Sequence, residues 1–463
     1  MNLTKIFSLI PEVRKPEEKK LSFNIKLKWT LIILGAFFVL ANIPLFGLSN
    51  NALERFEFLA VLLATDFGSI ISLGIGPIVM GSIILQLLAG SGILNIDTNT
   101  PEGRKFFQGI QKILVFFFIL FESIVYVGMK GLEAMPGFAG IVIFQLILGG
   151  LAIFYMNEVC EKWGFGSGVS LFIGAGVSWT LFTSAFQFIN QQGKNCLIDF
   201  SNTPCSGKVF VLIQSIINKY PVEILSALAA ILATIVIFLI VVWAQSLKVE
   251  IPLSFGRIRG YGVKWPLAFF YASVIPVILT AALVANIQLF GGLIENWRGS
   301  PTFLGSFVGG QPVSGLAFWI GSTNLLELII RGGFLWKYLL QGLVHILFYM
   351  GLATLFSVFW VKTAGMDARS QAQKIASSGL QVSGFRQDTR ILESILERYI
   401  MPLTIMGGAA IGLLASFTNL LGALVGGTSI LLVIMIFHQF YQSIAQQHMT
   451  DMNPGMRKFM GGE

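Results

Sequence analysis

The chain has 463 residues, of which 55% are hydrophobic and 12% are charged, and its mean hydropathy is +0.77. Soluble domains carry about 25% charged residues, so this composition excludes a soluble globular protein and indicates a polytopic integral membrane protein. The first thirty residues hold charges where a signal peptide would need an apolar core, so we expect no cleaved signal.

Ten apolar segments, taken in chain order, are candidate membrane spans, and they predict an all-α fold. They centre on residues 29–47, 73–91, 110–129, 138–157, 169–188, 222–243, 266–289, 339–360, 400–417 and 426–443. Polar or Gly-rich sequence at 193–219 and 291–337 predicts long loops. We leave open whether residues 306–322, which are apolar over a short run, dip into the membrane interface.

The second of these segments, LGIGPIVMGSIILQLLAGSG at 73–92, opens with Gly74, Gly76 and Pro77, which break or bend helices. The apolar stretch before it, within 52–66, has only about half the length that a spanning helix needs. We interpret 52–66 as a re-entrant half-helix, because irregular backbone at membrane depth is tolerated only inside protein or beside a water-filled cavity. The alternative is one ordinary kinked span.

The distribution of basic residues predicts the orientation. If each span reverses the chain, 23 of the 31 Lys and Arg residues fall on the side that holds both termini, and 8 fall on the other side. Cytoplasmic loops carry such an excess of basic residues, so we expect both termini to be cytoplasmic.

Two cysteines, Cys196 and Cys205, share the predicted outer loop between the fifth and sixth spans. Outside a cell such a pair can form a disulfide bond that closes a small loop. The alternative, which the sequence leaves open, is a pair of unlinked thiols.

Catalytic and metal-binding patterns are absent from the sequence: it contains no HExxH, Walker loop or GxSxG elbow. Within the spans the ionisable candidates are Glu122, His345 and His438, and we interpret such lone histidines as hydrogen-bonded packing residues. We therefore expect no enzyme activity, no metal and no cofactor.

Two long basic segments, 246–265 and 362–398, lie on the predicted cytoplasmic side. Long connections of this kind are usually functional, although basic loops near a membrane can also serve only to hold the topology. Arginine binds phosphates through its planar fork, so a phosphate-rich partner fits these segments. Docking of RNA at the cytoplasmic face of a membrane protein suggests a ribosome.

Six segments of the sequence resemble the SecY family, in particular its archaeal members. They are LGIGPIVMGSIILQLLAGSG (73–92), GFGSGVSLFIGAGVS (164–178), VEIPLSFGRIRG (249–260), IPVILTAALVANIQ (275–288), SGFRQ (383–387) and LGALVGGTSILL (421–432). The resemblance implies two inverted five-helix halves, 1–220 and 221–463, arranged as a clamshell. It also implies that the half-helix is a plug.

The resemblance assigns residues to four parts of such a channel. The plug would be Phe56, Glu57, Phe58, Leu59, Ala60, Val61, Leu62, Leu63, Ala64 and Thr65, with Gly68 and Gly74 as flexible joints. The pore ring would be Ile75, Val79, Val169, Ile173, Ile278 and Leu432. The lateral gate would include Met80, Glu122 and Asn286, and Arg257, Arg259 and Arg386 would contact a ribosome or motor. Met80 departs from the family, in which a polar residue is common there.

The function that the resemblance implies is passage of unfolded secretory chains across a membrane, with sideways release of transmembrane segments into lipid. The implied partners are SecE-like and SecG/Sec-beta-like small subunits, a ribosome, nascent polypeptides and the bilayer. The implied location is the plasma membrane of an archaeal-like prokaryote. The alternative is a secondary transporter, which would also show an inverted repeat and a broken helix.

Overall fold

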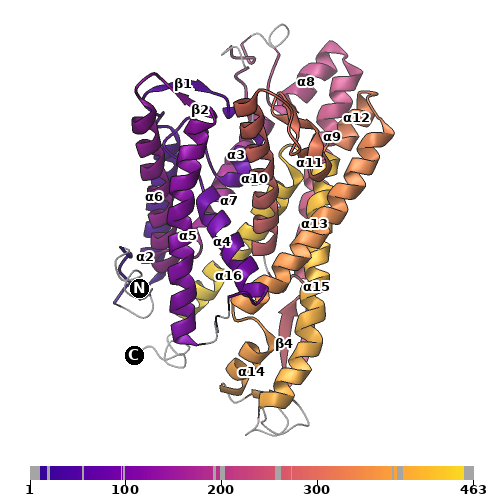
Figure 1. The fold of residues 1–463 in the computed structure, drawn as a ribbon. Coiled ribbons are helices and arrows are strands. Elements are labelled where there is room, and N and C mark those ends of the chain that lie inside the picture. Colours follow the sequence, from indigo (N-terminus) through magenta and orange to yellow (C-terminus); the bar gives the residue numbers. More distant parts are fainter. Residues whose placement is uncertain are drawn as a thin grey trace.

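In the computed structural model the chain folds into a bundle of long helices with small sheets at its two ends (Figure 1). The structure describes residues 11–17, 21–54, 57–94, 96, 100–190, 194–198, 204–255, 262–272, 274–377, 380–382 and 389–452. Nine described helices are long and apolar enough to cross a membrane. The predicted all-α membrane fold is confirmed.

The first part of the chain, up to residue 220, contains helices that correspond to the first five predicted spans. They are α2 (Phe23–Ala41), α4 (Gly76–Gly90), α5 (Pro101–Gly128), α6 (Ala139–Trp163) and α7 (Gly168–Phe186), with the short α3 (Glu57–Leu63) and α8 (Lys208–Asn218). Strands β1 (Leu48–Asn51) and β2 (Leu132–Ala134) pair antiparallel at one end of this group.

The second part contains the remaining five long helices. They are α9 (Pro221–Ser246), α10 (Ile275–Arg298), α13 (Trp336–Thr363), α15 (Thr389–Leu421) and α16 (Gly427–Met452), with the short α11 (Gly315–Ile320), α12 (Leu325–Ile330) and α14 (Ala368–Ser377). The strands are β3 (Lys248–Phe255), β4 (Gly262–Ala268), β5 (Ser306–Val308), β6 (Gln311–Ser314) and β7 (Leu380–Val382).

Local sequence explains where several helices begin and end. Thr100 caps α5, since its hydroxyl accepts a hydrogen bond from the Gly103 amide at 3.0 Å, and Pro101 follows at the first helical position. The Ser167 side chain caps α7 in the same way. Helix α10 ends at Arg298 and is followed by Gly299, whose φ of +68° lies in the left-handed region that glycine adopts without strain.

The structure corrects several predicted boundaries. The first span is Phe23–Ala41 rather than 29–47, and the second is the 15-residue α4, which is shorter than the roughly twenty residues of a full span. Helix α15 begins at Thr389, eleven positions before the predicted 400. The predicted loops 193–219 and 291–337 are partly helical, since they contain α8, α11 and α12 and the last turns of α10.

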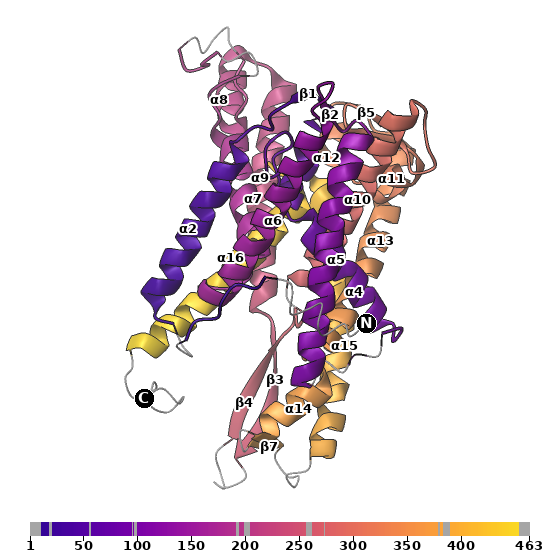
Figure 2. The ribbon, with the colours of Figure 1, turned by 60° about the vertical axis from the view of Figure 1, so that its left-hand side comes forward.

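The described parts of the basic segments 246–265 and 362–398 form strands and helices that pack on one another. Strand β3 pairs antiparallel with both β4 and β7, and α14 packs on α15 (Figure 2). A small apolar core that includes Ile251, Leu267 and Leu396 joins these elements. The Tyr271 hydroxyl donates to the Met366 carbonyl at 2.6 Å, and burial raises the pKa of Tyr271. We call the end of the molecule that holds β3, β4 and β7 the sheet end, and the opposite end the distal end.

The first long helix, α2, and the last, α16, meet at the sheet end. The Lys26 ammonium group lies 3.0 Å from Oε1 of Gln447, and Nε2 of Gln447 donates to the Leu21 carbonyl at 2.9 Å. Helices α2 and α16 therefore lie side by side, as Figure 2 shows. The start of the first span and the end of the last lie at the same end of the bundle.

The described N-terminal residues 11–17 are tied to α5 and α6 by charge. The Lys162 ammonium group donates to Glu12 at 2.8 Å, and the Lys112 ammonium group donates to Glu158 at 2.8 Å. The hydrogen bond from Lys162 and the charges of both lysines lower the pKa of Glu12, although its partial burial opposes this. This cluster holds the segment against the sheet end of two neighbouring spans.

Candidate functional site

Helix α3 is a seven-residue helix at the centre of the bundle, where the sequence predicts the plug. It packs against α7 from the first part of the chain and against α10 from the second (Figure 1). Leu59, Ala60 and Leu63 on this helix are at most 6% exposed. Phe56, the first predicted plug residue, lies outside the described residues. The segment therefore does not cross the bundle but is enclosed between its two parts.

Backbone contacts join the end of α3 to the start of α4. The Ile75 amide donates to the Leu63 carbonyl at 2.9 Å, and the Thr65 hydroxyl donates to the Ile71 carbonyl at 2.8 Å. Gly74 has a φ of +53°, and a Cβ on it would lie 2.4 Å from the Leu63 oxygen. Only glycine fits this position without moving the backbone.

The second predicted joint, Gly68, also has a backbone that favours glycine. Its φ is +102°, and a Cβ there would lie 2.9 Å from Nδ2 of Asn51. That nitrogen donates to the Phe67 carbonyl at 2.8 Å. Both predicted joints therefore sit in turns that glycine permits, while their flexibility stays a prediction.

The six predicted ring residues come from four helices around α3. Ile75 and Val79 lie at the start of α4, Val169 and Ile173 on α7, Ile278 on α10 and Leu432 on α16. Five of them are at most 5% exposed and belong to one apolar core, and the partly buried Val169 packs against that core. The ring positions are thus apolar and central, as a constriction requires.

Two of the predicted gate residues, Glu122 and Asn286, are buried, and no hydrogen bond joins them in the described structure. Nδ2 of Asn286 donates to the Ala282 carbonyl of its own helix at 2.8 Å, and its Oδ1 has no hydrogen-bond partner in the part of the chain that the structure describes. Both carboxylate oxygens of Glu122 are buried without a hydrogen-bond partner among the described residues. One of them lies near Gly76, where a Cβ would be 3.1 Å away. Met80 is partly buried on α4.

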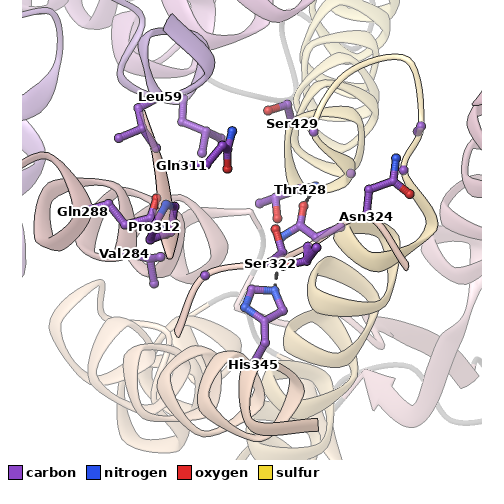
Figure 3. Close-up of a pocket in the computed structure, with 18 of the residues that line it drawn as sticks. Leu59, Val284, Gln288, Gln311, Pro312, Ser322, Asn324, His345, Thr428 and Ser429 are labelled. Carbon is purple, nitrogen blue, oxygen red and sulfur yellow. Dashed lines mark hydrogen bonds between the residues drawn. The ribbon is translucent and has the colours of Figure 1, made fainter. Parts of the chain in front are cut away.

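A cavity of about 1080 Å³ lies beside α3 (Figure 3). Leu59, Val61 and Leu62 of α3 form one wall. The other walls come from α7, α10, α13, residues 311–331 and residues 419–429. Polar side chains face this space; Gln288, Asn324, His345 and Thr428 are among them.

Hydrogen bonds of α13 fix the wall of this cavity. Nδ1 of His345 lies 2.7 Å from the Ile320 carbonyl, and Nε2 of Gln341 donates to the Phe318 carbonyl at 2.7 Å. The prediction that His345 is a hydrogen-bonded packing residue is confirmed. Sequence reasoning missed Gln288 and Gln341 as cavity residues, although polar side chains inside otherwise apolar spans were the available signal.

Of the remaining predicted residues, the structure describes the two cysteines but not the three arginines. A disulfide bond joins Cys196 and Cys205. Arg257, Arg259 and Arg386 lie outside the described residues. Among the residues that the structure describes, no group of three or more His, Cys, Asp or Glu residues is arranged to hold a metal ion.

Comparisons with known proteins agree on one family. The family model described as SecY matches residues 69–441. The protein translocase subunit SecY of Methanothermobacter thermautotrophicus is 40% identical over 461 residues, covering 98% of each chain. A solved SecY channel, whose plug domain is described as stabilising the closed state and maintaining a membrane seal, superposes with a TM-score of 0.83 at 37% identity, covering 99% of this chain and 100% of that one. Sec61 in the canine ribosome-channel complex from the endoplasmic reticulum superposes with a TM-score of 0.79 at 36% identity, with the same coverage.

Proposed function

The chain belongs to the SecY family, and we propose that it is the central, pore-forming subunit of a protein translocation channel. Unfolded secretory chains pass through it from one side of the membrane to the other. Transmembrane segments leave it sideways into lipid. The enclosed, seven-residue α3, bonded at its end to the start of α4, is the observation that carries this proposal.

The pore ring in this proposal consists of Ile75, Val79, Val169, Ile173, Ile278 and Leu432. A narrow apolar constriction loses its water, so it blocks ions in the resting channel. Aliphatic side chains also have no hydrogen-bonding preference, so the same ring fits around polypeptides of any sequence. The burial of these residues in one core around α3 supports this role.

The plug closes the pore on the distal side of the ring. The buried faces of Leu59 and Leu63 on α3 favour the closed position because apolar surface removed from water is stabilising. The cavity beside α3 offers space on the distal side. An arriving chain displaces α3, and the turn through Gly68 and Gly74 absorbs the movement.

The lateral gate lies between α4 and α5 on one side and α10 and α13 on the other. In this proposal Glu122 and Asn286 lie at the seam. Their buried oxygens without a hydrogen-bond partner among the described residues make the closed seam less stable than a fully apolar contact would be. An apolar segment in the pore prefers lipid by about half a kcal/mol per leucine, so a run of leucines is needed to draw it out.

The sheet end faces the cytoplasm in this proposal, together with both termini, because that side carries the excess of Lys and Arg. We place the channel in the plasma membrane of an archaeal-like prokaryote. Arg257, Arg259 and Arg386 contact a ribosome or motor there, which agrees with the ribosome-bound state of the canine relative. SecE-like and SecG/Sec-beta-like subunits complete the channel. No step requires catalysis by this chain, since the partner supplies the energy.

The test is reconstitution of the channel complex into sealed vesicles. The vesicles should stay tight to ions and small solutes until a ribosome presents a nascent secretory chain, which should then become protected from protease. A secondary transporter would instead accumulate a small solute without any polypeptide. Solute uptake by the resting protein, with no protected polypeptide, would overturn the proposal.

A further inference from the structure

The turn that follows α5 is anchored within the first part of the chain. Helix α5 ends at Gly128, and the amides of Ala52 and Leu53 donate to the Gly131 carbonyl at 2.9 and 3.2 Å. Lys130 has a φ of +56°, a conformation that is uncommon for a residue other than glycine. These hydrogen bonds from the residues that follow β1 hold the turn in this conformation.

That carbonyl is bound by a residue from the second part of the chain. Nδ2 of Asn296, in the last turn of α10, donates to the Lys130 oxygen at 3.0 Å. One turn earlier Leu293, which is 1% exposed, packs on the neighbouring residue: a Cβ on Gly131 would lie 2.4 Å from its Cδ2. The distal end of α10 therefore rests on the turn through one hydrogen bond and one close apolar contact.

We infer that Asn296 and Leu293 on α10, together with the turn at Lys130 and Gly131, form a distal clasp that holds the lateral gate closed. The inference rests on the proposed gate and adds positioning residues to those that the family resemblance assigns. Phe121 on α5 and Phe290 on α10 contact each other across the same seam, with ring centroids 6.4 Å apart and ring planes tilted by 53°. Separation of α5 from α10 during release of a segment has to break the clasp.

The contacts of the clasp can break and form again. Lys130 is exposed and Asn296 is partly exposed, so water replaces their hydrogen bond once the helices separate. The net stabilisation by such a bond corresponds to roughly a twofold to tenfold change in an equilibrium. A bond of this strength favours the closed gate but does not prevent it from opening. A sufficiently hydrophobic segment can therefore open the gate, whereas a less hydrophobic one does not.

The test uses the reconstituted channel complex and a series of nascent chains whose guest segment contains increasing numbers of leucines among alanines. Asn296→Asp keeps the size of the side chain and removes the donor. At the composition where the unaltered channel inserts half of the chains, it should raise the ratio of inserted to translocated chains by roughly twofold to tenfold. Gly131→Ala should act in the same direction, because its Cβ displaces Leu293. Asn296→Gln keeps the donor and should retain most of the original threshold.

Two controls separate a gate effect from a general loss of structure. Arg298→Gln alters an exposed residue of the same helical turn and should leave the threshold unchanged. Cross-linking of Phe121→Cys with Phe290→Cys by a short bifunctional thiol reagent in the resting channel should decrease when Asn296→Asp is added. If the unaltered channel works and both Asn296→Asp and Gly131→Ala keep its threshold, the clasp is wrong and the channel proposal stands. If the unaltered channel neither inserts nor translocates the chains, both are wrong.

Discussion

Two regions differ in the atoms that make their contacts: backbone atoms at the joint between α3 and α4, and side chains at the seam between α5 and α10. At the joint, backbone groups of Leu63, Gly74 and Ile75 approach one another directly. At the seam, the contacts are made by side chains such as Phe121 and Phe290, with a hydrogen bond from Asn296 at the distal end.

This difference separates the two movements that a translocation channel needs. The joint cannot change shape without rotation of backbone dihedral angles, so α3 should leave its place as a unit that swings about its glycines. The seam can part by exchange of side-chain contacts for lipid or for an arriving segment. Substitutions at the joint should therefore have larger effects than substitutions at the seam.

The largest effect is expected for Gly74→Ala. The new Cβ would collide with the Leu63 oxygen, and the left-handed φ alone costs about 1–3 kcal/mol. We expect displacement of α3, measured as ion leakage through the resting channel in planar bilayers. Gly92→Ala is the matched control, because Gly92 has a φ of +81° and no atom within 4 Å of its Cβ position. Equal leakage from the two variants would show that the close approach at Gly74 is not the cause of the leakage.

A smaller effect is expected for Asn286→Leu at the seam. The substitution removes a buried oxygen that has no partner in the described structure, and an unsatisfied group of this kind costs about 1–3 kcal/mol. The closed seam becomes more stable, so a guest segment should need more leucines to insert. A graded series of guest segments measures this shift. An unchanged or lower threshold would show that Asn286 does not lie on the path of release.

The smallest effect is expected for Glu12→Gln, far from both regions. Ion pairs of exposed side chains contribute about 0–1 kcal/mol, so the melting temperature should change little. Because the pKa of Glu12 is lowered in the folded protein, its stabilising contribution is present above the ordinary value of 4.5 and is lost as the pH falls through the lowered pKa. Hydrogen exchange should therefore show residues 11–17 loosening at low pH, and Glu12→Gln should loosen them already at neutral pH. Equal exchange in the two proteins at neutral pH would contradict the pairing with Lys162.

Much of the membrane fold could be predicted because hydropathy reports directly on burial in lipid. The predicted and observed bounds agree closely for segments such as Gly168–Phe186, which are apolar throughout. The start of α15 was missed because residues 389–399 extend the helix ahead of its apolar stretch. These residues include charged side chains, so hydropathy indicates a loop there. Strands β3 and β4 were missed because hydropathy does not report on strand pairing: β3 pairs with β4 and also with β7, which is distant in sequence.

The central site could be predicted only through family resemblance. A buried aliphatic residue such as Ile278 is indistinguishable by chemistry from any packing residue of a span. The contacts of Asn296 with Lys130 and of Leu293 with Gly131 were beyond prediction, because they join residues 166 and 162 positions apart, and the first uses a backbone carbonyl that any amino acid carries. Structure was needed to show which groups face each other across the seam.

The central claim is that polypeptides pass through the ring formed by Ile75, Val79, Val169, Ile173, Ile278 and Leu432. Cysteines placed at Ile75 and Ile278, and at Leu232 on the exposed face of α9 as a control, can be tested for cross-linking to a cysteine in a stalled nascent secretory chain. The account predicts cross-links at Ile75 and Ile278 and none at Leu232. Cross-links at Leu232 with none at either ring position would contradict it.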